Sequence, residues 1–309
     1  MQTLHFTLLG KLKIYGEYKE LIPLDAQKAQ ELLSYLLLYR DRLHEREKLA
    51  TLLWGETTPV HSKQYLRQTL WYVQSKLNLP ALSEPLLVVD HHQIGINPQA
   101  KFSLDVATFE QTFTSLEHTP GASLSLPQME QLRQTVALYQ GDLLEGWYQD
   151  WCIYERDRYQ NIYLAMLDKL LSYSEVQHEY ESGLAYGWQI LHYDRAREAT
   201  HRRLMRLHYG AGNRTAAIQQ YHTCVAALAE ELGVGPAKST LALYEQICAD
   251  GVAGLASPQA EISTSPESPA PEPPLPLQQL ERIQKTLTQL QAQVIELVHF
   301  FEQSNSTSF

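Results

Sequence analysis

The segment from Ser62 to Asn78, SKQYLRQTLWYVQSKLN, constrains the fold most, because its side chains follow a helical period. One apolar stripe at three- and four-residue spacing predicts a helix that faces a core, formed by Leu66, Leu70, Val73 and Leu77. Six polar side chains lie largely off that stripe: Lys63, Gln64, Arg67, Gln68, Gln74 and Lys76. No acidic residue occurs between Glu56 and Glu84, in a chain whose formal net charge is −10. Such a polar face suits DNA contact, although an ordinary amphipathic surface helix can also carry it. The neighbouring elements therefore decide between a DNA-reading helix and a surface helix.

The elements on either side of this segment complete a winged-helix pattern. Apolar runs separated by tight-turn glycines predict short strands within residues 2–24. A helix from about Asp25, with Asp25 as its N-cap, and a second helix over residues 44–53 come next. Residues 86–97 predict a hairpin with residues 90–92 at its tip. Strands, helix, helix–turn–helix and hairpin follow in the order of a winged helix, which makes the opening segment the reader helix and the hairpin the wing.

Side chains near the N-terminal end of a reader helix reach the floor of the major groove first. Arg67 can therefore contact guanine, and Gln64 or Gln68 can contact adenine. Trp71 shares a face with Arg67, where it packs against the wing, covers a sugar, or is a half-buried structural residue. The wing histidines are phosphate candidates or simply polar loop residues. The predicted DNA-binding residues are Lys63, Gln64, Arg67, Gln68, Trp71, Gln74, Lys76, Arg46, Lys48, His91 and His92.

Charge and composition narrow the class of protein. Residues 1–100 carry 11 Lys and Arg against 10 Asp and Glu, so they net +1 and the remainder nets −11. An acidic whole limits nonspecific DNA affinity and makes the local basic patch matter more. Three widely spaced cysteines indicate a reducing compartment without a disulfide frame. The sequence contains no signal-peptide h-region and no apolar run long enough to span a bilayer, so we expect a cytoplasmic protein without a membrane partner.

Motifs for catalysis are missing from the sequence. The string HEREK lacks the second histidine of HExxH, and His91–His92 has no further zinc ligands nearby. Neither GxSxG nor a glycine-rich phosphate loop occurs. We therefore expect no enzyme activity, no metal and no cofactor.

From Leu104 onward the sequence predicts helices almost throughout, arranged as antiparallel pairs. A weak 34-residue echo, Leu184 with Ile218 and Leu191 with Val225, matches the tetratricopeptide period. Five aromatic residues gather in one stretch, Trp147, Tyr148, Trp151, Tyr154 and Tyr159. We interpret them as packing between helices, with a partner surface as the alternative.

Two further segments follow the helical region. Residues 251–276 are rich in proline and serine, which predicts an extended linker. Beyond them lies a heptad seam of Leu280, Ile283, Leu287, Leu290, Val294, Leu297 and Phe301. The seam predicts a coiled-coil helix through which chains form a homo-oligomer; a helix that folds back on the helical region is the alternative.

The sequence resembles the Streptomyces antibiotic regulatory protein family, in its short form, from about Leu4 to Ile247. The strings that carry the resemblance, in the family's order, are FTLLGKLKIYG, KAQELLSYLLLYRDRLHEREKLATLLWGE, LDVATFEQTF, LYQGDLLEG, ERDRYQNIYLAMLDKLL and YGAGNRTAAIQQYHTCVAALAEELGVGP. Family reader helices are often richer in arginine, whereas Tyr72, Gln74 and Ser75 stand in the C-terminal half here.

The resemblance implies an OmpR-type winged helix joined to a bacterial transcriptional activator domain with tetratricopeptide-like helices, an α+β region followed by an all-α one. It further implies a transcriptional activator that binds direct repeats in double-stranded promoter DNA and holds RNA polymerase there. The competing hypothesis is an oligomeric protein-interaction scaffold whose winged helix does not bind DNA. We divide the chain into a winged helix at 1–100, an activator domain at 101–250, a linker at 251–276 and an amphipathic helix at 277–303.

Overall fold

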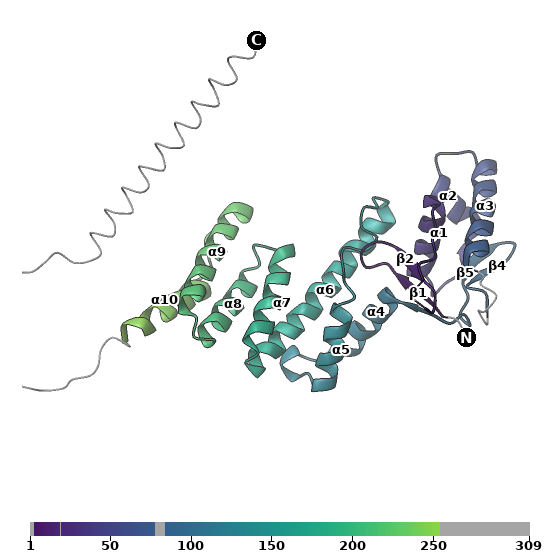
Figure 1. Ribbon diagram of the computed structural model, residues 1–309. Coiled ribbons are helices and arrows are strands. Elements are labelled where there is room, and N and C mark those ends of the chain that lie inside the picture. Colours follow the sequence, from purple (N-terminus) through teal and green to yellow (C-terminus); the bar gives the residue numbers. More distant parts are fainter. Residues whose placement is uncertain (1–2, 19, 78–83, 254–309) are drawn as a thin grey trace, which may run out of the picture. The chain divides into compact units, whose positions relative to one another are not determined.

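A computed structural model describes residues 3–18, 20–77 and 84–253 (Figure 1). The predicted linker and the heptad seam lie outside the described residues. Strand β1 (Leu4–Thr7) is the centre of the first sheet, whose order is β2-β1-β6. Strand β2 (Lys13–Tyr15) pairs antiparallel with β1, and β6 (Phe102–Leu104) pairs parallel with its other edge. The chain thus returns to its first strand just before the helical region begins.

The predicted third strand of the N-terminal segment is wrong. Leu21 forms only an isolated bridge with Tyr15, and the Ile22 amide donates to the Ile14 carbonyl. The next residue, Pro23, has no N–H to extend the ladder, so regular pairing stops there.

The helix–turn–helix and the wing follow. Their elements are α1 (Gln27–Leu38), β3 (His44–Glu45), α2 (Arg46–Trp54), α3 (Pro59–Leu77), β4 (Leu87–Val89) and β5 (Gln93–Ile96). The second sheet has the order β3-β5-β4, so the two wing strands are extended by the short strand before α2. Because His44 and Glu45 pair with β5, α2 begins two residues after the predicted start.

Two further details differ from the predicted helices. Ala26, not Asp25, is the N-cap of α1, and it makes no side-chain cap. The side-chain amide of Gln30 donates to the Leu24 carbonyl at 2.6 Å, just before the helix. Helix α3 starts at Pro59, earlier than predicted, which is a favourable first helical position because proline lacks the N–H that would be unpaired there. The stripe of Leu66, Leu70, Val73 and Leu77 is buried, as the sequence predicts.

The regular elements of the rest of the described chain are helices. The helices are α4 (Asp105–Leu116), a short 3-10 turn η1 (Gly121–Ser123), α5 (Leu126–Val136), α6 (Asp150–Gln177), α7 (Tyr180–Tyr193), α8 (Glu198–Gly210), α9 (Arg214–Leu232) and α10 (Lys238–Ala253). Each helix from α6 to α10 packs on the next. Close approach of α7 to α8 requires glycine, because a Cβ on Gly187 would lie 2.3 Å from Leu204 Cδ2.

The weak 34-residue echo has a structural counterpart. Helices α7 and α9 begin at Tyr180 and Arg214, which are 34 residues apart. Leu184 and Ile218 therefore occupy equivalent, half-buried positions in the two helices. The small residues Gly183 and Ala217, also 34 apart, are both buried where the helices cross their neighbours. These positions are typical of stacked helix pairs.

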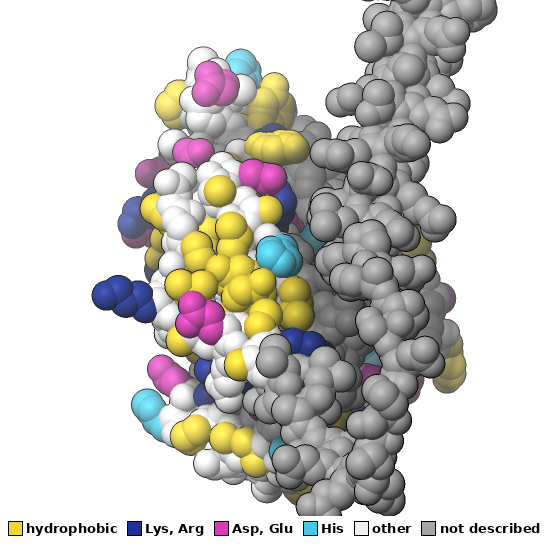
Figure 2. All heavy atoms as spheres, turned by 90° about the vertical axis from the view of Figure 1, so that its left-hand side faces the viewer, with side chains coloured by type: hydrophobic (Ala, Val, Ile, Leu, Met, Phe, Trp, Pro, Cys, Tyr) yellow, Lys and Arg dark blue, Asp and Glu magenta, His cyan; other side chains and the backbone are white. Residues whose placement is uncertain are grey.

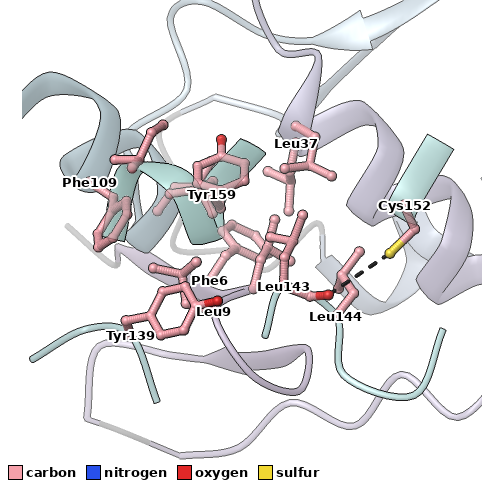
Figure 3. Packing of buried hydrophobic residues seen from close by; sticks show 14 of the residues in the cluster. Phe6, Leu9, Leu37, Phe109, Tyr139, Leu143, Leu144, Cys152 and Tyr159 are labelled. Carbon is pink, nitrogen blue, oxygen red and sulfur yellow. Dashed lines mark hydrogen bonds between the residues drawn. The ribbon is translucent and has the colours of Figure 1, made fainter. Parts of the chain in front are cut away.

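One continuous core joins the sheet region to the helices. Figure 3 shows Phe6 of β1, Leu37 of α1, Phe109 of α4 and Tyr159 of α6 gathered in one cluster. Tyr159 and Phe109 are fully buried. A core shared in this way fixes the winged-helix part against α4 and α6.

Some hydrophobic side chains of the helical region lie on the surface, at α9 and α10, and not in the core. Figure 2, which looks onto the left-hand side of Figure 1, shows hydrophobic side chains gathered where these two helices lie. Among the large hydrophobic residues of α9, α10 and the loop between them, Leu232, Val234 and Leu241 are 60%, 51% and 41% exposed. Exposed apolar side chains grouped on one face are suited to contact with another protein surface.

Candidate nucleic-acid interface

Helix α3 presents an uncovered polar face. Lys63, Gln64, Arg67 and Gln68 are exposed, at positions that repeat on the side away from the buried stripe. Trp71 continues this face one turn later and is 72% exposed. The interpretation of Trp71 as a half-buried structural residue is therefore wrong. The five side chains form what we call the reader face.

The C-terminal half of α3 is less available. Gln74 and Lys76 are only partly exposed. The ammonium of Lys76 lies 5.7 Å from the centre of the Tyr72 ring, a cation–π contact within the helix. Ser75 donates to the Tyr72 carbonyl at 2.8 Å. These local contacts leave the reader face concentrated between Lys63 and Trp71.

The wing is closed at its tip by an acidic side chain. One carboxylate oxygen of Asp90 accepts the backbone N–H groups of His92 and Gln93, each at 2.6 Å. These hydrogen bonds hold the pKa of Asp90 below its ordinary value. The tip is also tied to the start of α2, because the Arg46 guanidinium donates to the Asp90 carbonyl at 3.1 Å and the Arg46 amide donates to the His92 carbonyl at 2.9 Å.

A groove of about 660 Å³ opens between α2, α3 and the wing tip. It is lined by Glu45, Arg46, Glu47, Lys63, Leu66, Arg67, His91 and His92. The structure therefore brings five of the predicted DNA-binding residues together here: Arg46, Lys63, Arg67, His91 and His92. Gln64, Gln68, Trp71, Gln74, Lys76 and Lys48 lie outside the groove lining.

The sequence interpretation missed the two carboxylates of this groove. The Lys63 ammonium forms an ion pair with Glu47 on α2, and the Lys48 ammonium pairs with Glu45 at 2.9 Å. Hydrogen bonding and charge from Lys63 lower the pKa of Glu47. The Glu45–Lys48 pair has helical i,i+3 spacing and can be read from the sequence. The Glu47–Lys63 pair joins two helices, so only the fold brings it together.

A second cluster of charges lies at the junction of α1, α4 and α6. The Glu110 carboxylate on α4 accepts from Arg40, which lies in the turn after α1, at 2.6 Å, from Arg158 of α6 at 2.9 Å and from the Tyr159 hydroxyl at 2.8 Å. Burial alone would raise the pKa of Glu110, but the hydrogen bonds of Arg40 and Tyr159 and the two guanidinium charges lower it. Glu110 thus connects the winged-helix part to the helical part.

Asp105 makes a second connection at the start of α4. Its buried carboxylate accepts the backbone N–H groups of Leu8 and Leu9 at 2.7 and 2.8 Å, where the chain leaves β1. Burial raises the pKa of Asp105 to about 6, and the N–H groups of Leu9, Leu8 and Val106 oppose that shift.

The aromatic stretch of residues 147–159 divides between core and surface. Trp151 meets Tyr35 of α1 edge to face at 5.4 Å, and Tyr159 is fully buried. Tyr148 and Tyr154 are 80% and 71% exposed. Packing therefore accounts for Trp151 and Tyr159, whereas the exposed side chains of Tyr148 and Tyr154 are available to contact a partner.

In the part of the chain that the structure describes, no three His, Cys, Asp or Glu side chains are grouped as a metal site. Within residues 3–18, 20–77 and 84–253, no helix is both long and apolar enough to cross a bilayer.

Comparison with known proteins identifies the class of the helical region. Residues 104–248 match the family model of the Bacterial transcriptional activator domain. The description of that family names a domain of bacterial transcriptional activators. The helical region of this chain is thus similar to the domain that this family model describes.

Two individual proteins extend this comparison to the N-terminal region. The regulatory protein AfsR of Streptomyces coelicolor is 26% identical over 272 residues, which cover 87% of this chain and 27% of AfsR. This chain therefore spans about a quarter of the length of that relative. EmbR of Mycobacterium tuberculosis, solved in complex with a low-affinity phosphopeptide, has the same fold, with a TM-score of 0.58 and 20% identity over 81% of this chain and 66% of EmbR. The resemblance predicted from the sequence is confirmed.

Proposed function

We propose that the protein binds promoter DNA sequence-specifically through α3 and activates transcription. The observation that carries the proposal is the reader face: two glutamines, one arginine, one lysine and one tryptophan exposed on consecutive turns beside a wing. Phosphate contacts position a protein on DNA, and base contacts in the major groove specify the sequence. The reader face carries side chains suited to both roles.

Each side chain of the reader face has a physical role in this proposal. Arg67 donates two hydrogen bonds to guanine, and Gln64 or Gln68 pairs with adenine, each good pair contributing roughly 1–3 kcal/mol of discrimination. Lys63, Arg46 and Lys48 neutralise phosphates, as do the wing histidines when they are protonated. Trp71 covers a sugar at the edge of the contact.

The helical domain serves as the protein-contact part. Its continuous core with the winged helix fixes the orientation of each copy, so that two copies on direct repeats present the same face to a neighbour. Exposed Tyr148, Tyr154 and the apolar side chains of α9 and α10 are suited to meeting RNA polymerase or another protein. Self-association through residues 280–301 stays a prediction, tested by comparing the mass of the intact chain with that of a chain ending at Asp250.

The exposed apolar side of α9 and α10 also suits the competing scaffold hypothesis, in which the winged helix does not bind DNA. The two functions differ in one measurable property. A scaffold shows no salt-dependent DNA affinity, whereas a regulator loses affinity steeply as salt rises, by a slope near −0.9 for each neutralised phosphate.

The test is binding to DNA fragments selected from the source genome. Arg67→Ala and Lys63→Ala should both weaken binding, and Arg67→Ala should also relax the preferred sequence at one position. Arg206→Ala removes an exposed arginine from α8 and is the matched control. Unchanged binding in both reader-face variants would overturn the assignment of α3.

A further inference from the structure

Lys63, the first cation of the reader face, already forms an ion pair in the protein without DNA. Its ammonium pairs with the Glu47 carboxylate across the groove between α3 and α2, and both side chains remain largely exposed, at 55% and 76%. Exposed ion pairs contribute little to stability. The pair can therefore open at small cost when a stronger anion approaches.

The charges of the groove show what an incoming phosphate meets. Arg46, Lys63 and Arg67 face Glu45 and Glu47, so the lining nets one positive charge while the histidines are neutral. A DNA phosphate that binds Lys63 must displace Glu47 and leave that carboxylate beside the DNA backbone. The complex then gains the contact between Lys63 and the phosphate, but the protein loses the ion pair between Lys63 and Glu47.

We propose that Glu47 competes with DNA phosphate for Lys63 and so limits the affinity of the protein for all DNA. This inference rests on the proposed function. Because nonspecific binding depends on phosphate contacts almost entirely, a carboxylate that masks one cation leaves stable binding dependent on the base contacts of Gln64, Arg67 and Gln68. Glu47 acts on affinity and leaves base preference unchanged.

The experiment is a double-mutant cycle on the full chain with Glu47→Gln, Lys63→Ala and both together. Binding is followed by fluorescence anisotropy, with one duplex selected from the source genome and one scrambled duplex of equal length. Glu47→Gln should tighten binding to both duplexes by the same factor, about two- to fivefold, and steepen the salt slope by about 0.9. Lys63→Ala should cost more affinity in the Glu47→Gln background than in the natural protein, since Lys63 is then free.

Glu45→Gln is the matched control, because Glu45 lines the same groove but pairs with Lys48. It removes the same charge and should show no coupling to Lys63→Ala. All substituted side chains are exposed, and circular dichroism verifies that each variant is folded.

Two results would overturn the inference. Additive effects of Glu47→Gln and Lys63→Ala would mean that Glu47 merely repels DNA at a distance. Weaker binding of Glu47→Gln to the selected duplex alone would mean that Glu47 reads a base. Arg67→Ala distinguishes failure of the competition from failure of the proposed function. If Arg67→Ala weakens binding while the cycle is additive, only the competition by Glu47 is contradicted. If no variant alters binding, the proposed DNA-binding function is contradicted as well.

Discussion

The groove beside α3 and the junction of α1, α4 and α6 use the same kinds of ion pair in different surroundings. In the groove, Lys63 and Glu47 are 55% and 76% exposed and form a single pair. At the junction, Arg40 and Glu110 are 27% and 21% exposed, and Glu110 accepts from three side chains, one in the turn after α1 and two on α6. Water and salt screen the first pair far more than the second. The comparison shows that charge in the groove is open to exchange with another anion, as the proposed DNA binding requires, whereas charge at the junction holds two parts of the fold together.

The largest effect on stability is expected at the junction. Glu110→Ala leaves the Arg40 and Arg158 guanidinium groups and the Tyr159 hydroxyl without their shared partner. The free energy of unfolding should fall by about 3 kcal/mol, near the lower end for breaking a buried pair because Glu110 is partly exposed. Urea unfolding measures the change, with Glu181→Gln on α7 as the control. A loss of unfolding free energy as small as that of the control would mean that the ion pairs of the junction stabilise the fold no more than those of the groove.

Asp105 gives the connection between β1 and α4 a pH dependence of its own. Its pKa in the folded protein is about 6, against about 3.9 in an unfolded chain, so the folded state favours the neutral form. The contribution to stability is therefore fully present below about pH 4 and is lost as the pH rises through about 6, by about 3 kcal/mol in all. Asp105→Asn cannot ionise, so the natural protein should lose stability relative to this variant over that range. Parallel curves for the two proteins would contradict the prediction.

Trp71 tests the other side of the comparison, the exposed face of α3 next to the groove. Since it is 72% exposed, Trp71→Ala should change the free energy of unfolding by no more than about 0.5 kcal/mol. DNA affinity should nevertheless fall about fivefold, or about 1 kcal/mol. Anisotropy and urea unfolding on the same variant separate the two quantities. A large loss of stability with unchanged affinity would assign Trp71 to the fold after all.

The smallest effect is expected at Lys76. Its ammonium lies over Tyr72 and the side chain is half-buried, so Lys76→Ala should lower DNA affinity by less than twofold, well below the effect of Lys63→Ala in the Glu47→Gln background. Binding of the two variants to the same duplex checks the order. If Lys76→Ala has the larger effect, the contact extends along the C-terminal half of α3.

Local sequence patterns predicted the elements that depend on near neighbours. The spacing of Leu66, Leu70, Val73 and Leu77 predicted α3 and its buried side, and the two strand-like runs on either side of residues 90–92 predicted the wing. These signals are encoded within a few residues, because a helix or a hairpin repeats over that distance.

Contacts between distant residues could not be predicted in the same way. Strand β6 pairs with β1 across almost one hundred residues, and its three residues carry no periodic signal. Nothing in the sequence around Glu47 indicates that the fold places Lys63 of α3 beside it. The burial of Asp105 likewise follows from the packing of α4 on β1 and not from its neighbours in sequence.

Selection of bound DNA by the natural protein and by Arg67→Ala tests the central claim most directly. The account predicts that the natural protein enriches a repeated half-site and that Arg67→Ala enriches the same repeat with relaxed choice at a single position, guanine on one strand. Enrichment of the same sequences by both proteins, or of none by either, would contradict the assignment of α3 as the element that reads bases.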